Sequence, residues 1–449
     1  MSNQRMKKRK VIYYIDALVI LLSFAGVRGN ALLFKLLGVE SQRLVSDLVI
    51  LVDIAYIFAN SKRLLDFARS PYLRPVIFFI SILALNVFNF VIGGKGFGVQ
   101  FDWLVLFILV IVILRGLAKD YYKTNKELSV GWLSRGYIWI TLISVLGVFI
   151  AFALTLAWGP DLTPFDAEFL VTHNEREDVS HYWCYTSMLM QELFSIRIPF
   201  FQENGYLTGL YHEPHIFALN AYPGLLLLLG LTRKRWQDAL VIVSMVLAFL
   251  FSGSLTSLLS LTVCLIIFFF LNSKRKLFPT LFALAIIAVG VYIFLQVTDS
   301  VYADFVADRL DDSESGSMGY STSALLFAVT PHSLFGNNIL STEAARNMVQ
   351  YGTMGDADVG FIAFFLNIAF LVSYGINTAK LLFTDNKTAK AVGYASLYCL
   401  LHSAKSGMGL YVQLTPMFLV FLQYLALVTY GRRKTVKTNT REREAVATV

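Results

Sequence analysis

The sequence predicts an all-α, polytopic integral membrane protein with about 12 transmembrane helices and two long structured loops on the outer side. Three observations carry this prediction. Long apolar stretches recur along the chain at lengths that suit the core of a bilayer. Arginine and lysine gather in alternate connections between these stretches, and the two longest of the remaining connections are acidic.

Composition points to the same class of protein. Hydrophobic residues make up 56% of the 449 and charged residues only 15%, which is unlike the mixture of a soluble domain. The net charge of +8 in such a chain indicates contact with anionic lipid at the inner membrane face rather than with nucleic acid.

The candidate spans are each roughly 16–22 residues long, as a bilayer crossing requires. Several are short for a straight crossing, which leaves room for tilt, a re-entrant segment or a count that differs by two. In chain order they cover residues 11–27, 45–60, 76–93, 100–114, 137–158, 214–231, 238–252, 255–272, 278–297, 359–377, 391–404 and 410–430.

The distribution of basic residues orients these spans. With the N-terminus in the cytoplasm, the inner segments hold 29 of the 38 lysines and arginines, and every inner connection is basic. A shift by one span would invert this pattern. The positive-inside bias therefore places both termini on the cytoplasmic side of the membrane, with residues 1–449 as a single membrane domain.

Both ends of the chain fit this topology. Lys7 to Lys10 precede an apolar run without a small-residue cleavage site, so we interpret that run as a retained first span. Residues 431–449 are basic and then mixed in charge, as in a disordered cytoplasmic tail that anchors the topology. The three cysteines, Cys184, Cys264 and Cys399, offer no disulfide framework.

The two outer loops, about 159–213 and 298–358, are too long to be simple connections between helices, and loops of this length usually carry function. Each holds many acidic residues and only two arginines. An anionic ligand would therefore depend on a few placed arginines. All six histidines fall on the outer side, where we expect any proton transfer to occur: His173, His181, His212, His215, His332 and His402.

The first loop enters a span through the stretch that runs from Ser195 to Gly224. Arg197 has a planar guanidinium that suits a pyrophosphate, and Gly209 allows close approach of the backbone. His212, Glu213 and His215 meet the start of the span around Pro214. Glu213 and Pro214 also fit ordinary helix capping, and an ionisable group at this boundary has functional uses as well, so both interpretations stay open.

A metal site is disfavoured in this segment. His212 and His215 flank Glu213 and Pro214, but the helical His-Glu-x-x-His spacing is absent and the proline breaks the geometry. Farther along the chain, Phe251 to Ser257 form a polar outer turn whose small hydroxyl residues usually satisfy backbone groups.

The second loop carries Arg309 within an acidic run, then the stretch from Thr330 to Asn338 with His332 and Gly336. It ends in Asp356 and Asp358 at the mouth of a span. A helix N-terminus there would favour one aspartate as a cap, and the alternative is a general base for a sugar hydroxyl.

These motifs resemble, in order and spacing, those of the Wzy-type O-antigen and exopolysaccharide polymerases. The shared features are an arginine before a glycine and a Glu-Pro pair at the start of a span, a Ser-Gly-Ser-Leu-Thr turn, a Pro-x-x-x-Phe-Gly piece and an aspartate at the entry to a late span. The resemblance spans most of the chain, although each motif is weakly specific.

The resemblance implies a GT-C-like membrane glycosyltransferase that works at the periplasmic face without metal, nucleotide sugar or other cofactor. It would transfer the growing glycan from undecaprenyl pyrophosphate to a hydroxyl of an incoming lipid-linked repeat unit. Besides these lipid-linked donor and acceptor substrates and membrane lipids, it points to a chain-length regulator and the flippase of the same pathway as candidate partners.

Carried over residue by residue, the resemblance assigns Arg197, and with less support Arg309, to the pyrophosphate. The arginine that family members often place about fifteen residues before the Pro-x-x-x-Phe-Gly piece is missing here, since that region reads Gly316 to Tyr320. Glu213, His215, Asp358 and His332 are the candidate acid–base residues. Gly209, His212, Pro214, Gly336 and Asp356 are assigned to substrate positioning.

Two other functions stay open. An O-antigen ligase would use the same carrier, with His332 as its histidine, although the Glu-Pro segment fits a polymerase better. A transporter or flippase would carry ionisable residues near the middle of its spans, where this chain has only Asp16 and Asp53 in early spans. For Asp53 we favour an inward-facing acid satisfied by neighbouring helices over a proton relay.

Overall fold

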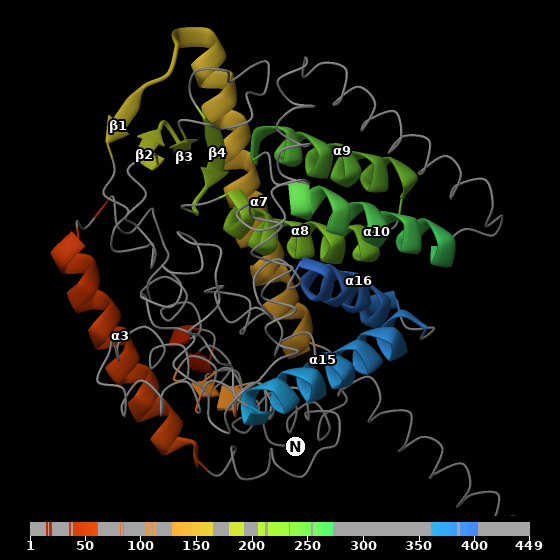
Figure 1. The fold of residues 1–449 in the computed structure, drawn as a ribbon. Coiled ribbons are helices and arrows are strands. Elements are labelled where there is room, and N and C mark those ends of the chain that lie inside the picture. Colours follow the sequence, from red (N-terminus) through yellow and green to blue (C-terminus); the bar gives the residue numbers. More distant parts are fainter. Residues whose placement is uncertain are drawn as a thin grey trace, which may run out of the picture.

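The structure is a computed structural model that describes residues 39–61, 128–164, 179–192, 205–211, 214–232, 234–252, 255–272, 361–383 and 387–402, with a few separate positions between 15 and 113. Helices dominate this described part, and one small sheet interrupts them (Figure 1). The helices are α3 (Val39–Ala59), α7 (Leu128–Trp158), α8 (Pro214–Leu231), α9 (Arg235–Ser252), α10 (Leu255–Asn272), α15 (Phe361–Leu382) and α16 (Lys387–His402). The strands are β1 (Leu162–Pro164), β2 (Val179–Cys184), β3 (Ser187–Glu192) and β4 (Tyr206–Gly209).

Each of these helices falls on an apolar stretch that the sequence predicts as a span. Helices α8 and α10 have the predicted bounds, and α3, α7 and α9 begin several residues earlier than predicted. The predicted spans 278–297 and 410–430 lie outside the described residues, as do the spans 11–27, 76–93 and 100–114 except for separate positions. The cytoplasmic tail 431–449 also lies outside them.

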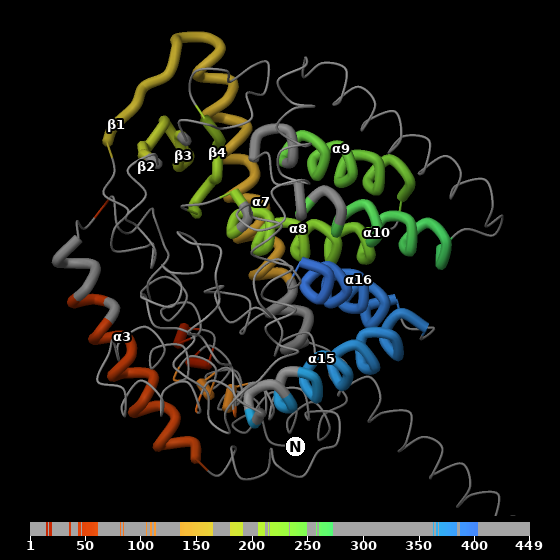
Figure 2. The backbone as a smooth tube through the Cα atoms, viewed as in Figure 1, coloured from red at the N-terminus to blue at the C-terminus, as the bar shows by residue number. Residues whose placement is uncertain are grey.

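Helix α8 is the centre of the described helices. It contacts α7, α9, α10, α16 and β4, and its residues from Ile216 to Leu227 are buried on every face. A helix that is apolar all round belongs in an interior rather than at a surface. Helices α9, α10, α8 and α16 are stacked side by side, α7 runs across one end of the stack beside the sheet, and α15 packs on α16 (Figure 1, Figure 2).

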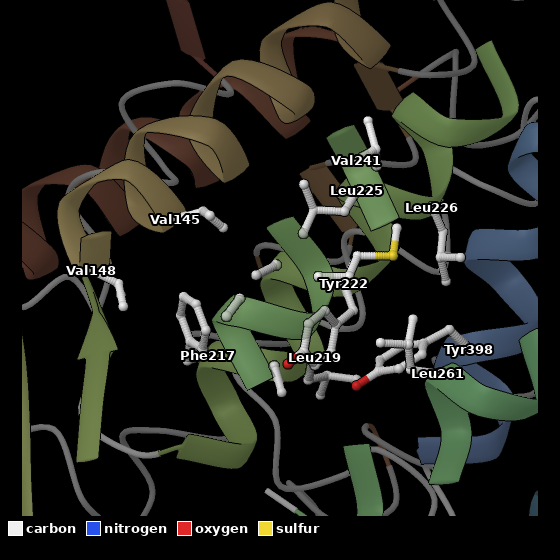
Figure 3. Packing of buried hydrophobic residues seen from close by; sticks show 14 of the residues in the cluster. Val145, Val148, Phe217, Leu219, Tyr222, Leu225, Leu226, Val241, Leu261 and Tyr398 are labelled. Carbon is white, nitrogen blue, oxygen red and sulfur yellow. The ribbon is translucent and has the colours of Figure 1, made fainter. Parts of the chain in front are cut away.

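The core of the structure lies where these helices meet (Figure 3). Phe217, Tyr222 and Leu226 of α8 are fully buried among side chains of four other helices. The ring of Tyr222 meets that of Tyr398 on α16 edge to face at 5.6 Å, a geometry that adds about 0.5–1.5 kcal/mol beyond simple burial. The core therefore depends on large side chains from α8 that fill the space between its neighbours.

The first long loop contains an antiparallel sheet with strand order β1-β2-β3-β4. The sequence analysis expected a structured loop but no strands. Strands β2 and β3 form a hairpin whose two-residue turn is Tyr185–Thr186, and turns of this length favour positive φ. Tyr185 adopts a φ of 51°, which a tyrosine rarely does, and its hydroxyl donates a hydrogen bond to the Gly159 carbonyl at 2.7 Å.

The sheet packs on the C-terminal half of α7. The Thr186 hydroxyl donates to the Gly147 carbonyl at 2.6 Å, and the Thr155 hydroxyl lies 3.6 Å from the Cys184 sulfur. All four residues of β4 are buried, and β4 also contacts α8 and α9. The described strands of the loop are thus joined to the helices by packing and hydrogen bonds.

Many large apolar side chains point outward from the described helices. On α3 these include Leu44, Leu51 and Phe58, and on α7 they include Trp139 and Trp158, all more than 60% exposed. A water-soluble protein rarely exposes contiguous apolar surface of this extent. The outer surface of these helices therefore requires an apolar surrounding or a partner.

Length and apolar character single out one helix of the described part as able to cross a membrane, at Arg135–Trp158, and only 28% of its most apolar stretch is buried. The apolar portions of α8, α10 and α15 are shorter, at Ile216–Leu231, Ser260–Asn272 and Ile368–Leu382. A straight crossing needs about 20 residues. The arrangement with about 12 spans therefore stays a prediction.

Two glycines provide a matched test of helix packing. A Cβ atom on Gly230 would lie 2.5 Å from the Ala391 Cβ of α16, whereas a Cβ atom on Gly136 of α7 would meet nothing within 4 Å. We expect Gly230→Ala to destabilise the protein by about 1–3 kcal/mol through overpacking. Gly136→Ala should be neutral or stabilise it by up to about 1 kcal/mol. Thermal unfolding of the two purified variants in detergent measures this difference, and equal shifts would contradict the packing of α8 on α16.

Candidate functional site

The described residues include a small part of the predicted site. Gly209 and Pro214 are described, and His215 is described as a backbone position in the first turn of α8. The remaining predicted site residues lie outside the described residues: Arg197, His212, Glu213, Arg309, His332, Gly336, Asp356 and Asp358. The structure therefore describes the candidate site only at the junction between β4 and α8, which borders His212 and Glu213 in the sequence.

Gly209 ends β4 in a conformation that only glycine adopts easily. Its φ is +63°, and a Cβ atom there would lie 2.5 Å from the Ser144 hydroxyl and 3.2 Å from the ring of Phe217. Left-handed backbone costs other residues about 1–2 kcal/mol. Gly209 thus has two independent reasons to be glycine, and both concern how β4 turns toward α8.

Hydrogen bonds hold this turn on both sides. The Gly209 amide donates to the Ser187 hydroxyl at 2.8 Å, and the Leu210 amide donates to the Ser144 hydroxyl at 3.4 Å. The Thr208 hydroxyl donates to the Tyr211 carbonyl, and the Tyr211 amide donates back to the Thr208 carbonyl at 3.1 Å. Side chains from α7 and β3 therefore fix the backbone directly before His212.

Tyr211 completes the junction. It is buried, and its ring lies 6.3 Å from that of Phe217 on α8. Burial raises the pKa of the Tyr211 phenol well above its ordinary value, so the hydroxyl stays neutral at physiological pH. Tyr211 acts here as a packed anchor rather than as a charged group.

Pro214 opens α8 immediately after the predicted Glu213. Proline suits the first position of a helix because its missing N–H would lack an intrahelical partner there. His212 and Glu213, which lie between Tyr211 and Pro214 in the sequence, are outside the described residues.

A second proline, Pro223, lies inside α8 and removes one backbone donor from it. One turn earlier, the Asn220 carbonyl accepts a hydrogen bond from the Tyr137 hydroxyl of α7. The Asn220 amide in turn donates to the Ile216 carbonyl at 2.8 Å. The Tyr137 contact therefore ties the first half of α8 to α7.

Several other ionisable residues of the described part are buried. Two of the six histidines, His181 in β2 and His402 at the end of α16, are buried. Asp16 and Asp53 are also buried, and the Tyr56 hydroxyl of α3 donates to Asp16. All three cysteines are free thiols, and burial raises the pKa of the Cys184 thiol. Within the described residues, no three histidine, cysteine or acidic side chains gather in a way that would hold a metal ion.

Sequence reasoning missed the residues that shape the junction, namely Ser144, Ser187, Thr208 and Tyr211. Their signal in the sequence is weak. Ser144 is a single hydroxyl residue in the apolar run of α7, and such residues usually bond to their own helix. Only the placement of β4 against α7 reveals that Ser144 instead serves a chain segment 66 residues away.

No protein-family model matches this chain, and no curated protein matches it. The proposals below therefore depend on the residues and their geometry together with the resemblance of motifs described above.

We expect Gly209→Ala to impair the junction, because the new methyl group meets Ser144 and the φ of +63° becomes strained. The free energy of unfolding should fall by about 1–3 kcal/mol. Ser144→Gly combined with Gly209→Ala should recover only the part of this loss that the Ser144 hydroxyl causes, and Ser144→Gly alone is the reference for its own cost. Thermal unfolding of these three variants separates the steric effect from the backbone strain, and a stable Gly209→Ala variant would contradict the left-handed turn.

Proposed function

We propose that this chain is a polysaccharide polymerase of the bacterial inner membrane, which joins undecaprenyl-pyrophosphate-linked repeat units at the periplasmic face. The observation that carries the proposal is the β4–α8 junction. Gly209 and Tyr211 form a hydrogen-bonded turn at the end of β4, and Pro214 opens a buried helix as the proline of the Glu-Pro pair that the sequence resemblance singles out.

The placement of charges along α8 supports the proposed orientation. The sheet lies at the start of α8, and the basic segment Arg233 to Arg235 follows its end. There the Lys387 ammonium at the start of α16 donates to the Thr232 carbonyl. The basic connections thus gather at the end of α8 away from the sheet, as they would if that end faced the cytoplasm.

The exposed apolar side chains of α3 and α7 support a lipid surrounding. Helices of membrane proteins face hydrocarbon with the same residue types that fill their interiors, so such exposure is expected there. We propose that these faces contact lipid and that about 12 spans anchor the chain, with both termini in the cytoplasm.

The proposed reaction balances without a cofactor. A bond forms between the anomeric carbon of the growing glycan and a hydroxyl oxygen of the incoming unit, and the bond from that carbon to the pyrophosphate oxygen breaks. Arg197 and Arg309 would stabilise the negative charge that develops on the leaving pyrophosphate. The proton of the acceptor hydroxyl passes to one of Glu213, His215, Asp358 or His332.

Deleting the gene tests this proposal. We expect single repeat units to accumulate on the carrier or to cap the core lipid, with long chains lost, as seen by mass spectrometry of lipid-linked glycans and by gels of the finished polysaccharide. Long chains stranded on the carrier would instead indicate a ligase, and an unchanged glycan profile would favour transport.

Arg197→Ala should abolish long chains without loss of membrane-inserted protein, because one lost charge-assisted contact in the transition state lowers the rate by about 100-fold or more. Arg197→Lys keeps the charge but not the bidentate fork, and it should restore part of the activity at most. Arg235→Ala, at an exposed arginine that starts α9, is the matched control and should leave chain length unchanged. Normal polymer from Arg197→Ala would remove this residue from the site.

Cysteine labelling tests the orientation. Thr163 in β1 and Arg235 in α9 are both exposed, whereas all three native cysteines are buried and give little background. In intact spheroplasts, a membrane-impermeant maleimide should label Thr163→Cys and spare Arg235→Cys. Both variants should react after the membrane is opened. Labelling of Arg235→Cys in intact spheroplasts would contradict the proposed topology.

A further inference from the structure

The end of α16 and the start of α10 are joined by a hydrogen bond between two buried polar side chains. The His402 Nε2 atom lies 3.2 Å from the Ser257 hydroxyl, and neither residue is exposed at all. The two residues are 145 positions apart in the chain, so the contact depends on tertiary packing alone. Neither residue was among the predicted site residues.

Two tyrosines extend this contact to α8. The ring of Tyr398, one turn before His402 on α16, lies 5.6 Å from the imidazole and 5.6 Å from the ring of Tyr222. Both tyrosines are fully buried. We call Ser257, His402, Tyr398 and Tyr222 the polar latch, because together they link α10 and α16 to α8; Figure 3 shows the two tyrosines.

The helices around the polar latch carry no carboxylate. Helices α8, α10 and α16 contain neither aspartate nor glutamate, and the lysines of α16, Lys387 and Lys390, lie at its opposite end. Helix α15, which packs on α16, carries only Lys380 near its own end. The Ser257–His402 hydrogen bond takes one partner from α10 and the other from α16, so its geometry suits a structural register between these two helices.

A buried hydrogen bond is selective because leaving either partner unsatisfied is far more costly than keeping both. Between apolar helices, which can slide past each other with little change in contact area, such a bond selects one axial offset. Ser257 and His402 meet only when α10 starts level with the end of α16. The latch therefore defines where the turn before α10 lies.

Helix α10 begins at Leu255, within the Ser-Gly-Ser-Leu-Thr motif, and α8 begins at Pro214, two turns before Tyr222 or about 12 Å along the axis. We infer that Ser257 and His402 are positioning residues that hold the start of α10 in register with the start of α8. This inference rests on the proposed function, since the positioned segments are those of the proposed site.

The experiment compares Ser257→Ala, His402→Leu, their combination and His402→Gln. Each purified protein is placed in proteoliposomes with lipid-linked repeat units extracted from a strain that lacks this protein, and the rate of chain growth is measured well below every unfolding midpoint. We expect about tenfold or greater loss for each single removal, because small misplacement of reacting groups is costly. The double variant should be no worse than the singles, since the two residues act as a unit. His402→Gln keeps a polar group near the serine and should recover most of the rate.

Ser260→Ala is the matched control. Ser260 is also buried on α10, one turn beyond Ser257, and its replacement should leave the rate unchanged. Unfolding midpoints of the same proteins are measured in parallel. If the changes in unfolding midpoint are non-additive but the rates of chain growth are unchanged, the polar latch is purely structural and the positioning role is wrong. If the changes in midpoint simply add, Ser257 and His402 are not coupled and the polar latch itself is wrong.

These outcomes separate the two proposals. If the wild-type protein fails to extend lipid-linked units and its deletion leaves the glycan profile unchanged, the proposed function fails and the positioning role fails with it, even where the unfolding midpoints of Ser257 and His402 variants are coupled. If the wild type extends chains and the latch variants match it, only the positioning role fails.

Discussion

The burial of α8 on every face is the constraint on which the rest of the described structure depends. A helix with no exposed side must be enclosed by α7, α9, α10 and α16, and the strand that precedes it must reach it without leaving polar backbone groups unsatisfied. The enclosure explains why a small sheet is attached to the helices at this place. It also explains why residues at the start of α8 have little freedom to move.

Several polar contacts in the described interior join elements that are distant in sequence. Tyr137 reaches a carbonyl of α8 near Pro223, Ser144 reaches the end of β4, and Asn272 donates to the Tyr394 hydroxyl at 2.8 Å. Apolar packing alone would leave helices free to slide. These contacts give the apolar helices a defined register, and the Ser144 contact does so at the β4–α8 junction.

The sequence predicted the helices well where a proline or a glycine turn marked the helix start. Pro214 marked the first residue of α8, and the Ser-Gly turn marked the start of α10. It failed for the sheet, because residues 187–190 of β3 and all of β4 are buried and lack the alternation that identifies a half-exposed strand. Of the candidate site, Gly209 proved to need its glycine, whereas Ser144 and Ser187 could not be predicted because their roles arise only from tertiary contact. Arg197 and Arg309 lie outside the described residues, so their roles rest on sequence.

Cys184 gives the sheet an unusual property for a domain proposed to face an oxidising compartment. Its sulfur is fully enclosed between β2 and α7, beside the Thr155 hydroxyl, and remains a free thiol. The described sheet is thus held by packing and hydrogen bonds, with no disulfide at this cysteine. Loosening of the hairpin from α7 would uncover a reactive sulfur, so mixed-disulfide formation at this position would report on local opening long before the helices separate.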